Sequence, residues 1–331
     1  MRAATDNLRQ VLGRFSRLTV TVWGDLVADV FVDGEIARVS REAPVLILKQ
    51  RRRQVAAGGG ANAALNLAAL GVTVRLVGAV GADEPGRELL RIFRTAGIAT
   101  GEVLRLRERP TPTKTRILAH HAHTAPQQVV RLDHEPAGLP AAQQRALAAA
   151  ARRAVRGAQA LLLSDYGYGA VTPGAAATVA AHVPVSAVDA RFQIAGYAGF
   201  TAATPNEPEL EAALNVKIAE AAEPLAALEQ AGHKLLRRLR CRHLLVTRGR
   251  DGMALFEPGQ RTRHWPVFGA QQALDVTGAG DTVIAVFTAA LAAGADGPTA
   301  AQLANCAGGL VVMKPGTATV SAGELSDAVQ R

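Results

Sequence analysis

Residues 274–282 read Leu-Asp-Val-Thr-Gly-Ala-Gly-Asp-Thr and lead directly into the apolar run Val283–Phe287. Small residues before such a run predict the opening of a long helix, with Asp281 in its first turn. The first N–H groups of a helix have no partner within it and the helix dipole is positive there, so the opening is suited to bind a phosphate. A carboxylate beside that phosphate can take the proton of an attacking hydroxyl, as a kinase requires. Taken alone, the stretch is explained more simply by a capped helix whose glycines relieve packing.

The composition is that of a globular chain. With 331 residues, 49% of them hydrophobic and 20% charged, it is long enough for one large α/β domain or two smaller ones. No apolar run reaches the roughly 20 residues that a bilayer requires, and the N-terminus lacks a signal-peptide pattern, so we expect no membrane partner. The two cysteines, Cys241 and Cys306, both stand beside apolar residues. This usage indicates a reduced, cytoplasmic protein.

The net charge of +9 favours an anionic partner. A nucleic acid, a membrane surface or a phosphorylated small molecule would each satisfy that charge. The basic residues are scattered without interleaved aromatics, and no helix-turn-helix, finger or RNA-binding signature occurs. We therefore expect a small anionic ligand and no nucleic acid.

Two carboxylates follow the first predicted strand, Leu18–Trp23. Gly24 ends this strand, which places Asp25 at its C-terminal edge and Asp29 nearby. Ligands collect beyond the C-terminal ends of strands in open α/β sheets, so these carboxylates are suited to bind sugar hydroxyls. The alternative is that Asp25 and Asp29 only stabilise a turn or cap a helix.

Residues 58–71 predict a glycine turn, an apolar helix and a stop at Gly71. Asn62 and Asn66 are one helical turn apart and would point the same way, toward a ligand over the glycines.

A dinucleotide site is the alternative for this segment. Its loose pattern is met by Gly58, Gly60 and Ala63, with Asp83 in the place of the ribose carboxylate. The residues before Gly58 are Arg-rich, whereas that site requires an apolar strand, so we disfavour an NAD-binding oxidoreductase.

Short alternating segments within residues 30–56 and 103–134 predict a small exposed sheet that forms a lid over the site. Val103–Leu106, Thr113–Leu118 and Val129–Leu132 are its expected later strands. Such a lid excludes water during phosphoryl transfer. Lys114 and Arg116 lie on one face of the middle strand, spaced to hold an anionic group. Because the lid has exposed strand edges, we expect a homodimer in which two lids pair.

His120, His121 and His123 stand between two lid strands, where alternate members could face one metal ion. No nearby Cys, Asp or Glu completes a ligand set, so a polar loop is the simpler interpretation.

The second half of the chain repeats strand and helix in the doubly wound manner, and polar residues follow each strand. We therefore predict one α/β domain over residues 1–331, with a mainly parallel sheet flanked by helices. Expected strands end at Asp165, Asp189, Ala203 and Val246. No Gly-x-x-x-x-Gly-Lys-Ser/Thr loop occurs, so a nucleotide must be held differently than in P-loop enzymes.

These segments together resemble the ribokinase-like (pfkB) carbohydrate kinases along nearly the whole chain, and most closely the heptose 7-phosphate kinases. The family signatures are Gly59-Gly60-Ala61-Asn62 with Asn66, and Asp275-Val276-Thr277-Gly278-Ala279-Gly280-Asp281. The heptose-kinase features are Gly24-Asp25 with Asp29, Arg38-Val39-Ser40, Glu42-Ala43-Pro44-Val45, Thr113-Lys114-Thr115-Arg116, Arg131-Leu132-Asp133, Ser164-Asp165-Tyr166-Gly167 and Gly316-Thr317-Ala318-Thr319-Val320.

The resemblance implies a role for each matching residue. Asp281 would be the base, and the N–H groups of Gly278, Ala279, Gly280 and Asp281 would form the anion hole. The sugar would be held by Asp25, Asp29, Gly59, Gly60, Asn62 and Asn66. ATP would lie along Thr247, Arg248, Gly249 and Asn305, while Asn206 and Glu209 arrange Mg²⁺ and the phosphates, Glu209 through water. A monovalent cation such as K⁺ would use Asp275 and the Thr277 carbonyl.

Three departures fall in regions that meet substrate or phosphates. Tyr168 stands where heptose kinases usually carry Lys, Asp189-Ala190-Arg191 replaces Asp-Pro-Lys, and residues 120–126 look like an insertion. Kinase chemistry survives these changes better than the heptose assignment does. Some relatives carry a second, nucleotidyl-transferring domain; no His-x-Gly-His motif occurs here, so we expect that activity to be absent.

The sequence therefore predicts an ATP-dependent kinase acting on heptose 7-phosphate at its anomeric hydroxyl. The same chemistry on another sugar, sugar phosphate or nucleoside is the first alternative. An oxidoreductase and a non-catalytic anion or nucleic-acid binder are the others.

Overall fold

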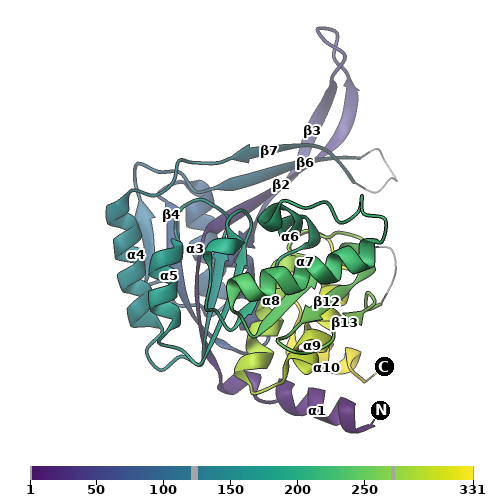
Figure 1. The fold of residues 1–331 in the computed structure, drawn as a ribbon. Helices are drawn as coiled ribbons and strands as arrows, with labels where there is room; N and C mark the ends of the chain where they lie inside the picture. Colours follow the sequence, from purple (N-terminus) through teal and green to yellow (C-terminus); the bar gives the residue numbers. More distant parts are fainter. Residues whose placement is uncertain (1, 121–125, 270–272, 331) are drawn as a thin grey trace.

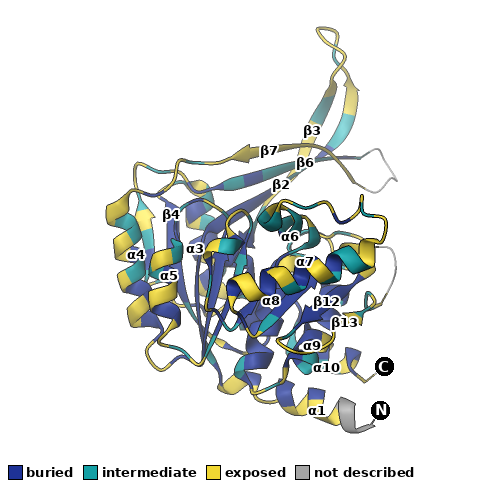
Figure 2. Cartoon of the chain, viewed as in Figure 1, coloured by how far each residue is buried: buried dark blue, intermediate teal, exposed yellow. Residues whose placement is uncertain are grey.

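The computed structural model describes residues 2–120, 126–269 and 273–330. A central sheet lies between two layers of helices, and a second, smaller sheet lies over one edge of this body (Figure 1). The inner strands of the central sheet are mostly dark blue in Figure 2, because helices cover both faces of the sheet. This architecture confirms the predicted α/β class with a mainly parallel sheet.

The central sheet has nine strands in the order β13-β12-β11-β10-β9-β8-β1-β4-β5. Neighbours from β5 to β11 run parallel, and β12 and β13 are antiparallel additions at one edge. Their bounds are β1 Thr19–Gly24, β4 Thr73–Gly81, β5 Val103–Leu106, β8 Ala160–Asp165, β9 Val185–Ala190, β10 Ala202–Ala203, β11 His243–Thr247, β12 Met253–Phe256 and β13 Arg263–Trp265.

The strand order reverses at β1. The chain moves outward from β1 to β4 and β5 on one side, and it then returns to β8 and proceeds outward on the other side. Ligands of open α/β sheets bind beyond the strand C-termini at such a switch point. The β1 and β8 ends, Gly24 and Asp165, are therefore expected to border the site.

Alternate residues of the strands face two hydrophobic clusters. Leu162 of β8 joins one cluster, and its neighbours Leu161 and Leu163 join the other. The first cluster contains α1 (Arg2–Leu12), α2 (Gly60–Ala69), α3 (Glu84–Thr95), α8 (Ala279–Ala292), α9 (Gly297–Val311) and α10 (Ala322–Ala328). The second contains α4 (Ala141–Ala154), α5 (Pro173–Ala180), α6 (Glu207–Leu214) and α7 (Pro224–Leu239).

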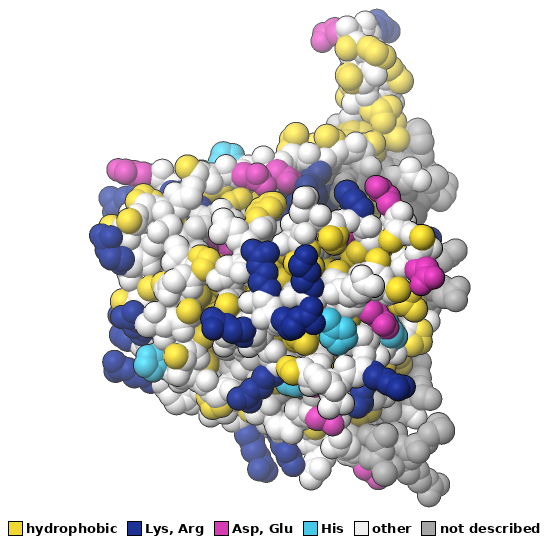
Figure 3. Space-filling model, in the orientation of Figure 1, with side chains coloured by type: hydrophobic (Ala, Val, Ile, Leu, Met, Phe, Trp, Pro, Cys, Tyr) yellow, Lys and Arg dark blue, Asp and Glu magenta, His cyan; other side chains and the backbone are white. Residues whose placement is uncertain are grey.

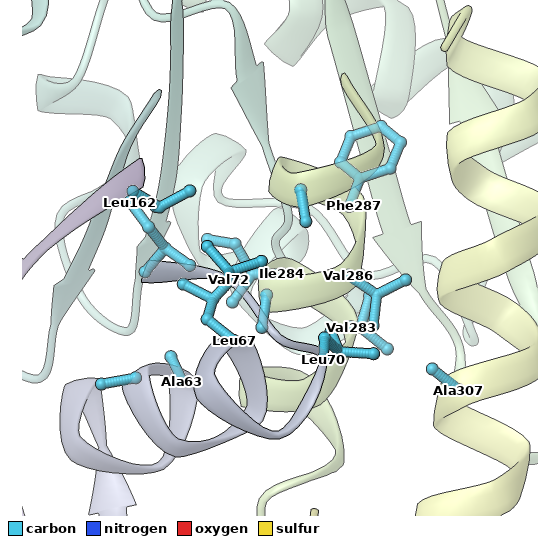
Figure 4. Close-up of a cluster of buried hydrophobic side chains, with 14 of the residues drawn as sticks. Ala63, Leu67, Leu70, Val72, Leu162, Val283, Ile284, Val286, Phe287 and Ala307 are labelled. Atoms are coloured by element: carbon cyan, nitrogen blue, oxygen red, sulfur yellow. The ribbon is translucent and has the colours of Figure 1, made fainter. Parts of the chain in front are cut away.

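Helix α8 is buried on every side because its sequence from Val283 to Leu291 is apolar all round, apart from Thr288. Figure 4 shows Leu67 and Leu70 beside Ile284 and Val283, with Ala307 of α9 beyond. Complete burial of a Leu or Ile side chain contributes roughly 1.5–3 kcal/mol, so this contact fixes α2 firmly against α8. The polar N-terminal turns of the two helices are thereby held together.

The second sheet has the order β3-β2-β6-β7 and forms the predicted lid. Its strands are β2 (Leu26–Val39), β3 (Leu46–Gly59), β6 (Thr113–His120) and β7 (Gln127–His134). The outer end of the β2–β3 hairpin projects away from the body (Figure 1). Strand β6 lies between β2 and β7, so Lys114 and Arg116 are on an inner strand as expected.

One predicted lid strand is wrong. Val103–Leu106 forms β5, which pairs in parallel with β4 at the edge of the central sheet. Val103 is buried in one core cluster while Leu104 and Leu106 pack against the other, so this strand needs cover on both faces. Alternation alone does not distinguish such an edge strand from a lid strand.

Within the described ranges, no helix is both long and apolar enough to span a bilayer.

Candidate active site

Asp281 is the third residue of α8 and is only 3% exposed. The helix begins after Gly278, whose φ of 77° lies in the left-handed region. A Cβ on Gly278 would also collide with the Asn62 amide. Glycine is therefore required here by backbone conformation and by the close approach of α2.

Two neutral donors hold the Asp281 carboxylate, one on each oxygen. Asn62 Nδ2 donates to Oδ2 at 3.0 Å, and the Tyr166 hydroxyl donates to Oδ1 at 3.1 Å. Asn66 Nδ2 donates to Asn62 Oδ1 at 3.1 Å, and Thr282 Oγ1 donates to Asn66 Oδ1 at 3.1 Å. The amide of Asn62 is thus fixed by a closed chain of hydrogen bonds from α2 to α8.

Burial raises the pKa of Asp281 to about 7, although the hydrogen bonds from Asn62 and Tyr166 act in the opposite direction. The nearby Asp29 carboxylate raises this pKa further, and Lys114 lowers it. A carboxylate whose pKa lies near neutrality is well matched to accept and release a proton at physiological pH. The arrangement suits a general base.

Two charged lid residues, Asp29 and Lys114, lie close enough to Asp281 to shift its pKa, and Arg116 pairs with the first of them. Arg116 Nη1 donates to Asp29 Oδ1 at 2.6 Å, and its guanidinium lies 5.4 Å from the Phe31 ring. Arg116 is therefore already neutralised. Lys114 is 8% exposed, and its Nζ lies 4.8 Å from the centre of the Tyr166 ring. Within the part of the chain that the structure describes, no carboxylate forms an ion pair with Lys114.

Asp25 is buried and accepts three backbone hydrogen bonds, from the N–H groups of Tyr166, Tyr168 and Ala170 at 2.8–3.0 Å. Burial raises the pKa of Asp25 to about 6 despite these donors. Its observed contacts hold the loop after β8, and its sugar-binding role stays a prediction.

The expected glycine turn at residues 58–60 is a direct junction between a strand and a helix. Strand β3 extends through Gly59, and α2 begins at Gly60. Gly59 has a φ of 58°, and a Cβ there would lie 3.1 Å from both the Asp25 carbonyl and the Tyr166 ring. The open backbone of Gly59 and Gly60 lies beside Asp25, where an acceptor is predicted to bind.

A cavity of about 370 Å³ lies behind the first turn of α8. Three of the predicted nucleotide-binding residues line it, namely Thr247, Gly249 and Asn305. Asn305 Nδ2 donates to the Pro266 carbonyl at 2.8 Å, which fixes one wall. Ala279 and Gly280 line the same cavity, so a nucleotide bound there would direct its phosphates at the helix opening.

The other predicted nucleotide-binding residues lie near this cavity with contacts of their own. Asn206 and Glu209 form a capping box at the start of α6, with bonds of 2.8 and 2.9 Å. Arg248 does not line the cavity, and its Nε lies 3.1 Å from Glu207 Oε2. Burial raises the pKa of Glu209, and the Glu209 carboxylate lies near that of Asp189.

The predicted cation ligands stand in the turn before α8. Asp275 Oδ1 accepts the N–H of Thr277 and Oδ2 accepts the N–H of Gly316, each at 2.9 Å. These bonds tie the turn to the loop at residues 314–319. A monovalent cation would have to use the remaining lone pairs of Asp275 together with the Thr277 carbonyl.

The predictions from sequence did not assign a role to Tyr166 or Asp189 in the site. Tyr166 contacts Asp281 directly. Burial and the nearby carboxylates of Glu209, Asp281 and Asp165 raise the pKa of Asp189 well above its usual range. Tyr166 directly follows β8, and Asp189 is the penultimate residue of β9, so their place at the C-terminal ends of strands is the signal that could have found them.

The departures from the heptose-kinase pattern also have defined positions. The Tyr168 hydroxyl donates to Glu135 Oε1 at 3.0 Å, and Arg191 lies 5.2 Å from the Phe192 ring. In the described ranges no three His, Cys, Asp or Glu side chains are placed to share a metal ion. His121 and His123 lie outside the described residues.

A mainly parallel sheet under a lid, with a cavity behind a glycine-opened helix and a buried carboxylate in that helix, is the arrangement expected of a small-molecule kinase. Residues 18–322 match the sequence profile of the pfkB family carbohydrate kinases. The chain therefore belongs to this family of ATP-dependent carbohydrate kinases.

Two curated relatives are both called bifunctional protein HldE. The chain is 40% identical to that of Pseudomonas syringae pv. tomato and 42% identical to that of Azotobacter vinelandii, each over 322 residues. Each match covers 96% of this chain and 65% of the relative, so the chain spans about two thirds of their length.

Solved structures show the same fold at lower sequence identity. Arabidopsis thaliana ribokinase, complexed with ribose and ATP, has a TM-score of 0.71 and 20% identity, over 95% of this chain and 98% of that one. Escherichia coli phosphofructokinase-2, complexed with potassium, has a TM-score of 0.74 and 16% identity over the same shares.

Proposed function

We propose that this enzyme transfers the γ-phosphoryl group of ATP to D-glycero-D-manno-heptose 7-phosphate at its anomeric hydroxyl. Asp281 takes the proton of that hydroxyl as the new oxygen–phosphorus bond forms and the bond to the leaving ADP breaks. The N–H groups of Gly278 to Asp281 stabilise the charge on the transferring phosphoryl group. The similarity to the HldE proteins supports the sugar assignment.

The position of Lys114 is the observation that supports a phosphorylated acceptor. A cation that is 8% exposed and has no ion-pair partner among the described residues is suited to an incoming anion. Lys114 Nζ lies over the face of the Tyr166 ring, and Asp281 accepts the hydrogen bond of the Tyr166 hydroxyl. A sugar bound between these two residues would place its existing phosphate at Lys114 and a hydroxyl at Asp281.

The test is ADP release with a panel of free and phosphorylated sugars. We expect heptose 7-phosphate to be the best substrate, and Lys114→Gln to raise its KM at least tenfold with little effect on the KM of ATP. Lys49→Gln, at an exposed site on β3, is the matched control and should leave the KM for the sugar unchanged. Turnover on unphosphorylated sugars alone would reject this substrate, and the best sugar of the panel would then replace it.

Mg²⁺ and K⁺ belong to the same proposal. The half-buried Glu209 carboxylate lies near that of Asp189, and such a pair of oxygen donors fits Mg²⁺ bound partly through water. When bound, Mg²⁺ neutralises the phosphates of ATP. Asp275 and the Thr277 carbonyl would hold K⁺. Activity should be lost on chelation of divalent cations, and replacement of K⁺ by Na⁺ tests the second site.

We also propose a cytoplasmic homodimer formed through the lid. Six large apolar side chains on its strands and hairpin are 43–58% exposed, namely Val39, Val45, Leu46, Val129, Val130 and Leu132. Figure 3 shows hydrophobic side chains along the projecting hairpin. Two lids packed together would cover them.

The test of the dimer is molar mass in solution by light scattering. Val45→Lys should shift a dimer toward the monomer, whereas Leu225→Lys, an apolar site 52% exposed on α7, should not. A monomeric wild-type enzyme would refute the dimer.

A further inference from the structure

We propose that Tyr166 is a positioning residue that aims the Asp281 carboxylate and keeps it ionised for proton transfer. This inference rests on Asp281 being the base, and it does not depend on which sugar is bound.

The hydroxyl of Tyr166 points at the base. It donates to Asp281 Oδ1 at 3.1 Å, while Asn62 donates to Oδ2 at 3.0 Å. One donor comes from the loop after β8 and the other from α2, so the carboxylate is held in one plane from two sides. Rotation of the carboxylate would break both bonds, and the remaining lone pairs stay directed at the acceptor.

Three contacts fix Tyr166 itself. Its backbone N–H donates to Asp25 Oδ2 at 2.8 Å, which anchors the loop. Its ring lies against the α-carbon of Gly59, where a Cβ would come within 3.1 Å of it. Lys114 Nζ lies 4.8 Å from the ring centre on the lid side. The hydroxyl therefore has little freedom to leave the base.

The protonation state of Tyr166 determines which group donates in its hydrogen bond with Asp281. Burial and the nearby carboxylates of Asp281, Asp189 and Asp29 raise the pKa of Tyr166 well above its usual range. The phenol stays protonated at physiological pH, so it acts as the donor. A hydrogen bond donated to a carboxylate favours the ionised form, which is the form a base needs.

Other charged groups also act on Asp281 from each side of the site. Asp29 of β2 and Asp189 at the end of β9 disfavour its ionised form, whereas Lys114 of β6 favours it. Asn62 of α2 is neutral. If the substrate carries a phosphate that binds Lys114, this phosphate compensates the charge of Lys114 and weakens its effect on Asp281. The Tyr166 hydroxyl is the donor that remains next to Oδ1 throughout.

The test is the Tyr166→Phe variant. It keeps the ring, its contact with Lys114 and the backbone bond to Asp25, and it removes only the hydroxyl. The acid limb of the kcat profile, measured from about pH 5 to pH 9, should move up by about one pH unit or more, because one charged hydrogen bond is lost. At the low end of this range kcat should fall about tenfold or more, and at the high end the loss should be smaller.

Tyr168→Phe is the matched control, because it removes a hydroxyl two residues away whose partner is Glu135. The acid limb of the kcat profile of Tyr168→Phe should coincide with that of the wild type. Ionisation of the substrate's own phosphate is common to all variants and cancels in the comparison. The inference would be overturned if the acid limb of the kcat profile of Tyr166→Phe coincided with that of the wild type while the melting temperature was unchanged.

Asp281→Asn separates this inference from the assignment of the base. If Asp281→Asn keeps full activity, Asp281 is not the base and the role of Tyr166 falls with it. If Asp281→Asn is inactive and only the sugar differs from the one proposed, the Tyr166→Phe profile is measured with that sugar and decides the inference alone.

Discussion

Replacement of Asp281 by Asn should make the protein more stable at neutral pH while it abolishes catalysis. The folded pKa of about 7 lies above the reference value of 3.8, because burial penalises the charged form. A group with a raised folded pKa contributes stability that is fully present below the unfolded pKa. That contribution is lost as the pH rises through the folded pKa.

The size of the effect follows from the same two values. A difference of about 3 pKa units corresponds to about 4 kcal/mol over the whole titration, and roughly 3 kcal/mol of this falls between pH 5 and pH 8. Asn has no charge to desolvate. Its carbonyl can accept from Asn62, and its amide can donate to the Tyr166 oxygen if that hydroxyl turns away.

The assay is urea denaturation of wild type and Asp281→Asn at about pH 5 and pH 8. The wild type should lose roughly 3 kcal/mol more than the variant between these two conditions, and kcat of the variant should fall at least 10²-fold. Asp6→Asn, at an exposed site on α1, is the control and should follow the wild type. Equal losses in wild type and Asp281→Asn would show that this carboxylate does not titrate with a raised pKa, and the argument would fail.

Three further changes test how the site is built. Gly278→Ala combines a positive φ with a clash at Asn62, and should lower the free energy of unfolding by about 1–3 kcal/mol, measured in urea, with loss of activity. Asp25→Ala leaves three backbone N–H groups without their acceptor, and should cost about 3 kcal/mol or more in the same measurement. Asn305→Ala removes the hydrogen bond to the Pro266 carbonyl that fixes one wall of the cavity. This change should raise the KM for ATP several-fold in an ADP-release assay, while the KM for the sugar stays unchanged.

Sequence patterns predicted the parts of the fold that depend on local periodicity. The apolar run after Asp281 became a fully buried helix, and the alternating segments around residues 113–118 became lid strands. Residues 103–106 were placed in the wrong sheet, because four alternating residues carry no information on which partner strand they meet. That choice is made by the cover on both faces of β5.

The contacts within the site could be predicted only in part. Asn62 and Asp281 were each identified from their own motif, but the bond between them depends on how α2 packs on α8. Arg116 was expected to bind substrate, and the structure shows it paired with Asp29. Such a pairing is set by register between β2 and β6, which is a tertiary property.

The packing that stabilises this fold also determines where its least favourable charge lies. The contact between Leu67 and Ile284 is part of the core, and it brings the N-termini of α2 and α8 together under the lid. Asp281 is buried there, so its carboxylate is destabilised in the ionised state. In the proposed reaction, the same burial would protect the transferring phosphoryl group from hydrolysis. A less buried site would make the folded protein more stable at neutral pH and the base weaker. Stability and catalysis are therefore opposed at Asp281, and Asn62 and Tyr166 set the balance because they are the two groups that donate to its carboxylate among the residues described.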